Sequence, residues 1–256
     1  MVRPSSISKA RSPRFATTRW SMVLQARSHP SPDARLALAD LCRAYWYPLY
    51  ALIRHRARDE HEAQDLTQEF FARLLEQEFL DDVDPARGRF RAFLLAAVKH
   101  FLANESDKNR ALKRGGGQRL LSLDLQPSDW ESGESRFRSH PAHELTAERL
   151  FERQWALSLL ERVLQRLRDE YTARGKLSQF EVLQPFLSLD RDLANYADAA
   201  RELDSTESAA RVAAHRLRQR YRELLRDEIA HTVTAREEIE DELRYLYAVL
   251  ARPPRS

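Results

Sequence analysis

The stretch Phe-Arg-Ala-Phe-Leu-Leu-Ala-Ala-Val-Lys-His-Phe-Leu, residues 90–102, carries the clearest helical pattern in the chain. Its apolar residues recur at spacings of three and four, which places them on one face of an α-helix. The residues on this face are Phe90, Phe93, Leu94, Ala97, Val98, Phe101 and Leu102. A continuous apolar face of this width must be buried, so residues 90–102 predict a core helix.

Two earlier stretches show the same spacing. Residues 31–52 begin with Ser-Pro-Asp, a typical start of a helix, and residues 59–77 carry an apolar stripe of Ala63, Leu66, Phe70 and Leu74. Short turns separate these stretches. We therefore expect three antiparallel helices that form a first domain over residues 18–109.

The composition of the whole chain points to a helical protein. Only 6 of 256 residues are glycine, the 42 basic and 39 acidic residues nearly balance at +3, and Cys42 is the single cysteine. This excludes an internal disulfide and favours a reducing, cytoplasmic location, and no apolar run approaches the roughly 20 residues that span a membrane. The composition predicts an all-α fold, with residues 1–17 as a basic, disordered tail.

The remaining sequence predicts a second domain. Residues 110–145 are rich in glycine, serine and proline without helical period, and predict a flexible linker. A helical pattern resumes at 151–171, and a short helix at 196–203, a break at 204–207 and a long helix to about 232 predict a helix-turn-helix within residues 146–233. Residues 234–256 predict an acidic helix and tail that packs back onto this second domain.

Charge is unevenly distributed along the chain. Residues 59–84 hold ten acidic residues against one arginine, a net charge of −9, which excludes contact with nucleic acid and suits a basic protein partner. A solvated helix face is the plain alternative.

Residues 99–119 reverse the sign, with a net charge of +4. Basic side chains beside rings and amides suit single-stranded nucleic acid, because cations neutralise phosphates while amides engage exposed bases. The candidates for this contact are Lys99, His100, Asn104, Lys108 and Arg110. We expect Phe90, Phe93 and Phe101 to lie in the core.

The long helix that begins near residue 206 has one cationic and one apolar face. A helix placed in the major groove needs this division, with the residues near its start facing base edges and later arginines reaching phosphates. The candidates are Thr206, Glu207, Ser208, Arg211, His215, Arg218 and Arg222.

The sequence contains no recognised motif of catalysis, phosphate binding or metal binding. We therefore expect no enzyme activity, no cofactor and no metal.

Three segments together resemble bacterial RNA polymerase sigma factors of the extracytoplasmic-function group. The segment Asp-Leu-Thr-Gln-Glu-Phe-Phe, residues 65–71, is similar to the family's conserved region 2.2, and residues 88–104 are similar to the regions that follow it. Residues 196–203 with the helix from Thr206 resemble region 4.2.

The resemblance implies a sigma factor that directs promoter recognition and transcription initiation. It assigns core polymerase binding to the acidic helix 59–77 through Asp65, Gln68, Glu69 and Phe70. It assigns the opened minus-ten strand to residues 89–114 and the duplex minus-thirty-five element to residues 206–226. An inhibitory protein partner is also compatible with this resemblance.

The chain departs from the family in the predicted turn, where Asp204 and Ser205 replace the usual glycine and apolar residue. Ala210 and Ala214 replace larger packing residues. Two other functions therefore stay open: a free-standing helix-turn-helix regulator, and a degenerate sigma-like protein that binds polymerase but no promoter.

Overall fold

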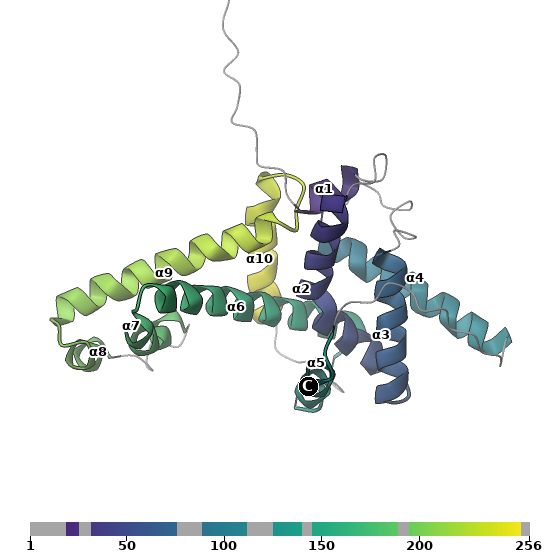
Figure 1. Ribbon diagram of the computed structural model, residues 1–256, viewed down its shortest axis with the longest axis horizontal. Helices are drawn as coiled ribbons and strands as arrows, with labels where there is room; N and C mark the ends of the chain where they lie inside the picture. The colour runs from purple at the N-terminus through teal and green to yellow at the C-terminus, as the bar shows by residue number, and fades with distance from the viewer. Residues whose placement is uncertain are drawn as a thin grey trace, which may run out of the picture.

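The computed structural model describes residues 19–25, 32–75, 89–111, 125–139, 145–188 and 195–251. These residues form α-helices and one 3-10 helix, and the only β-type pairing among them is an isolated bridge between Arg89 and Val233. This confirms the expected all-α class. The basic tail expected at residues 1–17 lies outside the described residues. The elements (Figure 1) are α1 (Arg19–Gln25), α2 (Pro32–Arg56), α3 (Glu60–Leu75), α4 (Phe90–Ala111), α5 (Pro127–Arg138), α6 (Ala147–Ala173), α7 (Leu177–Leu183), η3 (Gln184–Leu187), α8 (Tyr196–Glu202), α9 (Glu207–Ala230) and α10 (Glu237–Ala251).

Helix α2 is the centre of the fold. Every residue from Tyr47 to Ile53 is buried, so this part of α2 is enclosed on all sides, as expected of a helix that is apolar all round. It contacts α1, α3, α5 and α6, and its contact with α6 is the most extensive between any two described helices. The indole Nε1 of Trp155 on α6 donates a hydrogen bond of 2.9 Å to the hydroxyl of Tyr45 within this contact.

The apolar face of α4 lies in the core, as its spacing predicts. Phe90 and Phe101 are buried, and Phe93 is partly exposed. The Phe101 ring lies 5.6 Å from that of Phe70 on α3, and the Phe90 ring lies 4.9 Å from that of Trp20 on α1. The core aromatic residues therefore tie α1, α3 and α4 together.

The expected linker contains a helix that packs on the first part of the chain. Helix α5 occupies residues 127–138, which corrects the expectation that 110–145 lack helical structure. Pro127 begins the helix, where its missing N–H has no cost, and Gly133 allows close approach to α2, because a Cβ there would lie 2.8 Å from the Trp46 ring. Proline and glycine thus favour this helix and its packing.

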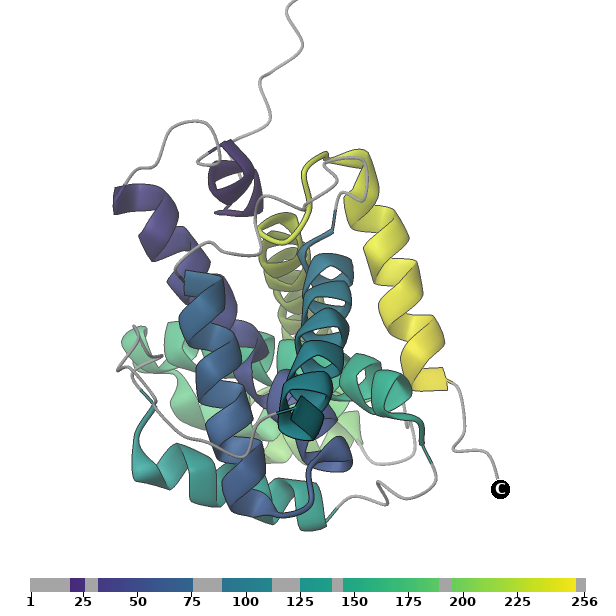
Figure 2. The same cartoon turned by 90° about the vertical axis from the view of Figure 1, so that its right-hand side faces the viewer.

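The second part of the chain packs along the first. Helices α6 and α9 lie side by side and extend away from α2, with α7 and α8 at their far end (Figure 1). Helix α10 contacts α6 and α9, as expected, and also reaches α4 (Figure 2). At the corner between α9 and α10, the carbonyls of His231 and Thr232 accept hydrogen bonds from the backbone N–H groups of Trp20 and Phe90. One set of buried residues therefore runs through both parts.

Candidate functional site

The acidic helix α3 exposes a narrow stripe of polar side chains. His61, Asp65 and Gln68 are exposed, at spacings of four and three residues, whereas Ala63, Phe70 and Leu74 of the same helix are buried. Asp65 forms no ion pair with another described residue. The stripe therefore offers a partner one unpaired carboxylate and one amide.

Two of the expected polymerase-binding residues are used inside the protein. Phe70 is 0% exposed and packs against Phe71 and Phe101, so it shapes α3 and does not reach the surface. Glu69 forms an ion pair with Arg73, which in turn lies 3.2 Å from Glu105 on α4. The accessible part of the predicted contact is therefore Asp65 with Gln68.

Helix α4 exposes a second stripe with a different character. Lys99, His100 and Asn104 are exposed, and the amide of Asn104 lies 3.4 Å from the Nδ1 atom of His100. The Nζ atom of Lys99 lies 3.4 Å from Glu148 on α6. Lys108 and Arg110 belong to α4, but their side chains lie outside the described structure. The described part of the predicted strand contact is thus one lysine, one histidine and one amide on a single helix face.

The start of α4 is covered by the C-terminal helix. Arg91 is 6% exposed, and its Nε atom lies 2.9 Å from the carboxylate of Glu242 on α10, which is 1% exposed. The Arg91 guanidinium also lies 4.0 Å from the centre of the Tyr245 ring, and Arg89 forms a second ion pair with Glu242 at 3.1 Å. Of the span 89–114 that the resemblance assigns to DNA, these two arginines are therefore engaged with α10.

The charges of Arg91 and Glu242 compensate each other inside the protein. Burial alone would lower the pKa of Arg91, but the hydrogen bonds and the charge of Glu242 outweigh burial and raise this pKa. The two residues are 151 positions apart. No local pattern in the sequence could have identified this pair.

Where the sequence predicts a helix-turn-helix, α8 and α9 are joined by a turn at residues 203–206. The N–H of Ser205 bonds the carbonyl of Ala200 and the N–H of Asp204 bonds that of Arg201, the two hydrogen bonds of a Schellman motif. Asp204 has a φ of +46°, in the left-handed region that favours glycine. Aspartate therefore makes the same turn that glycine would make. The hydroxyl of Thr206 then caps α9 by accepting from the N–H of Ala209.

Helix α9 exposes most of the predicted duplex-binding residues. Ser208, Arg211, His215 and Arg222 are exposed, on the side opposite the buried Ala210, Ala214 and Leu217. Glu207 is also exposed and forms an ion pair with Arg211. One face of α9 is therefore polar and accessible.

Arg218 is the exception among these residues. Its Nε atom donates to the carbonyl of Phe186 at 3.0 Å, and its Nη2 atom donates to the hydroxyl of Tyr196 at 2.7 Å. Arg211 lies over the ring of the same tyrosine, 4.6 Å from its centre. Arg218 thus anchors α8 and η3 to α9, so its guanidinium is engaged within the protein.

A second buried charge network fastens α5 to α2. Glu134 is 3% exposed and accepts hydrogen bonds from the Tyr50 hydroxyl at 2.6 Å, from Arg54 at 3.1 Å and from Arg138 at 3.0 Å. Burial alone would raise the pKa of Glu134, but these donors outweigh it and lower the pKa. The sequence reasoning missed this network because it treated the segment as a linker.

The candidate polymerase-binding and strand-binding stripes lie at the opposite end of the molecule from the candidate duplex-binding face. The exposed stripes belong to α3 and α4, whereas α8 and the start of α9 lie at the far end of the long axis (Figure 1). Among the described helices none is long and apolar enough to cross a membrane. No cluster of three or more potential metal-ligating side chains is found in the same residues.

Comparison with known proteins identifies one part of the chain. No curated protein and no solved structure matches the chain. Residues 41–111, which include α3, α4 and most of α2, match the family Sigma-70 region 2. The chain therefore contains a Sigma-70 region 2 domain, which includes both exposed stripes.

Proposed function

We propose that this protein is an RNA polymerase sigma factor of the extracytoplasmic-function type, which binds core polymerase in the cytoplasm and directs it to promoters. The observation that carries the proposal is the pair of exposed stripes within the matched residues 41–111. Sigma-70 region 2 binds core RNA polymerase and promoter DNA, and the two stripes differ in charge as these two partners require.

Asp65 and Gln68 are the residues that we assign to core polymerase. They are exposed on α3 and share one helix face. A carboxylate that forms no internal ion pair keeps its full attraction for a basic partner, because no neighbouring cation neutralises it. Phe70 supports this surface from below, by packing in the core.

Lys99, His100 and Asn104 are the described residues that we assign to the opened promoter strand. The cation can neutralise a phosphate, and the imidazole and amide can hydrogen-bond to exposed base edges. All three are exposed and lie within two turns of α4.

The exposed face of α9 is the part that we assign to duplex DNA. Thr206, Glu207, Ser208, Arg211 and His215 lie at the start of α9, where a recognition helix contacts base edges, and Arg222 lies two turns further on, where it can reach a phosphate. We assign Arg218 to holding α8 and η3 against α9, and not to DNA contact.

The first experiment measures binding to core polymerase. Asp65→Lys with Gln68→Lys should weaken retention on immobilised core polymerase by at least about tenfold, because two like charges replace an attractive contact. The matched control is Asp169→Lys with Gln165→Lys, an exposed carboxylate–amide pair on α6 that should leave retention unchanged. Equal effects of the two double variants would contradict the assignment.

The second experiment measures promoter-dependent transcription. His215→Ala with Arg222→Ala should lower transcription from a promoter selected by the holoenzyme and leave polymerase binding intact. The exposed Arg168 on α6 provides the control substitution Arg168→Ala. Duplex binding by the free protein with full affinity would favour the free-standing regulator, and polymerase binding without promoter selection would favour the degenerate sigma-like protein.

A further inference from the structure

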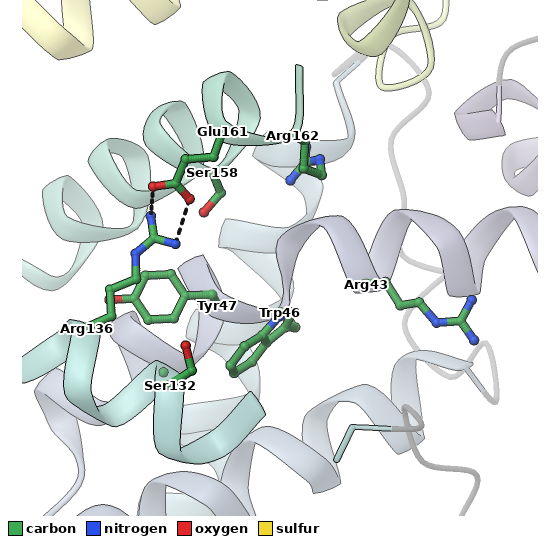
Figure 3. A pocket seen from close by; sticks show the side chains of 9 residues that line it. Arg43, Trp46, Tyr47, Ser132, Arg136, Ser158, Glu161 and Arg162 are labelled. Atoms are coloured by element: carbon green, nitrogen blue, oxygen red, sulfur yellow. Dashed lines mark hydrogen bonds and ion pairs between the residues drawn. The ribbon is translucent and has the colours of Figure 1, made fainter. Parts of the chain in front are cut away.

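A cavity of about 230 Å³ lies where α2, α5 and α6 meet (Figure 3). It is much larger than the roughly 30 Å³ that one water occupies, and smaller than the pockets that hold drug-sized molecules. The side chains that give it its chemistry are Trp46, Tyr47, Arg136, Ser158, Glu161 and Arg162. Its size therefore suits a small ligand.

Three buried polar atoms of the lining have no hydrogen-bond partner among the described residues. They are the hydroxyl oxygen of Tyr47, the Oγ atom of Ser158 and the Nε atom of Arg162. Tyr47 is 4% exposed and Ser158 is 8% exposed. Folded proteins rarely leave such atoms unsatisfied, because each has lost its hydrogen bonds to water. Their convergence on one cavity indicates that something in the cavity satisfies them.

The charge of the lining indicates what that is. Glu161 is held by Arg136 through two hydrogen bonds of 2.8 and 3.0 Å, so its charge is compensated. Arg162 donates through Nη1 to the carbonyl of Ala44 at 2.7 Å and forms no ion pair with a described carboxylate. Partial burial of the Arg162 cation lowers its pKa, because the cation loses solvating water. A hydrogen-bond acceptor that carries a negative charge would complement this site.

Several polar side chains of the lining lie close together. Figure 3 shows Ser158, Tyr47 and the Arg136–Glu161 pair gathered in one part of the cavity, with Arg162 to one side of them on α6 and Arg43 pointing away. The Arg136 guanidinium lies 4.3 Å from the centre of the Tyr47 ring, so this ring is held in place. The Trp46 ring provides an apolar wall.

We propose that this cavity binds a small organic oxyanion, a carboxylate or a phosphate monoester. The hydroxyls of Tyr47 and Ser158 and the Nε–H of Arg162 donate to its oxygens, and its apolar part lies against Trp46. Charge-assisted hydrogen bonds from arginine are the strong contacts that such a ligand requires.

The position of the cavity between three helices means that a bound ligand would stabilise their packing. The lining joins the part of α2 that lies within the Sigma-70 region 2 match to α5 and α6, which follow it in the chain. A ligand that binds only this packed arrangement stabilises it by mass action. The inference does not depend on the proposed function, since it rests on the cavity alone.

The test is a titration of the full chain at constant ionic strength with phenyl phosphate and with benzoate. Benzamide, the neutral counterpart of benzoate, is the control ligand, and inorganic phosphate tests for the oxyanion without the ring. We expect saturable heat of binding and a higher Tm with at least one of the two aromatic oxyanions and no effect of benzamide. Absence of saturable binding by both aromatic oxyanions would show that water alone fills the cavity and would overturn the proposal.

Variants locate the binding position. Tyr47→Phe, Ser158→Ala and Arg162→Gln should each weaken binding by about tenfold, the effect of losing one hydrogen bond to a charged group. Tyr171→Phe and Arg168→Gln, which change groups on α6 outside the lining, should leave the Kd unchanged. Binding that all three lining variants leave unchanged would refute the assigned position.

The unliganded variants provide a second readout. Tyr47→Phe and Ser158→Ala should leave the Tm of the free protein unchanged or raise it, because each removes a buried polar group that lacks a partner. A large fall in Tm would show that these groups hydrogen-bond to other protein groups in the folded chain, and would contradict their role as donors to a ligand.

Discussion

At the scale of single residues, two helix ends show how backbone conformation affects stability. Gly175 after α6 and Asp204 after α8 both have positive φ and close Schellman motifs. Gly175→Ala should lower the free energy of unfolding by about 1 kcal/mol, because a Cβ there meets nothing within 4 Å and only the backbone is strained. Asp204→Gly should raise it by about 0.5 kcal/mol, by relieving that strain and removing an acid from a helix C-terminus. Urea unfolding of both variants checks the two signs, and a loss of stability in Asp204→Gly would show that the aspartate side chain has a contact of its own.

A second residue-scale prediction concerns Glu134 and pH. The pKa of this group is lower in the folded protein than its ordinary value of about 4.3. Its stabilising contribution is therefore present above that value and is lost as the pH falls through the folded pKa. Glu134→Gln should lower the free energy of unfolding by about 3 kcal/mol at pH 7, because a buried charge network loses its anion, and the difference from the unchanged protein should shrink toward pH 3. A difference independent of pH would show that the network is not held by the carboxylate charge.

At the scale of elements, the docking of α10 depends on one buried ion pair. Replacing Glu242 by leucine should lower the free energy of unfolding by about 3–5 kcal/mol, because the buried Arg91 loses its closest ion-pair partner and keeps only Glu152, 3.8 Å away; adding Arg91→Met should recover part of that loss. The Arg226–Glu240 pair joins α9 to the same helix at the surface, so its double-mutant cycle should give less than about 1 kcal/mol. Equal coupling energies for the two pairs would refute the dominant role of the buried one.

At the scale of the whole molecule, the shared core predicts one cooperative unfolding transition. The contact between α2 and α6 crosses the boundary where the sequence suggested two domains, and the corner of α9 and α10 bonds α1 and α4. Trp155→Ala, which removes a fully buried ring from this contact, should lower the free energy of unfolding by about 3–5 kcal/mol and keep a single transition. Calorimetry checks this, and two separate transitions would support independent domains joined by a linker.

The sequence alone determined the all-helical class, the core face of α4 and the exposed polar positions of α3, α4 and α9. Helical periodicity is a local property, because residues three and four apart share a face wherever the helix packs. Periodicity placed Phe70 on the buried stripe of α3, and only the family resemblance assigned it to a contact surface, since a motif names residue types and not the depth at which each side chain lies. Only the tertiary structure decided that α5 packs on α2, that Arg218 is engaged, that Glu242 covers Arg91 and that Tyr47, Ser158 and Arg162 meet at a cavity. Most of these contacts join residues that are 80 to 151 positions apart, and their partners are selected by the packing of whole helices, which no local pattern encodes.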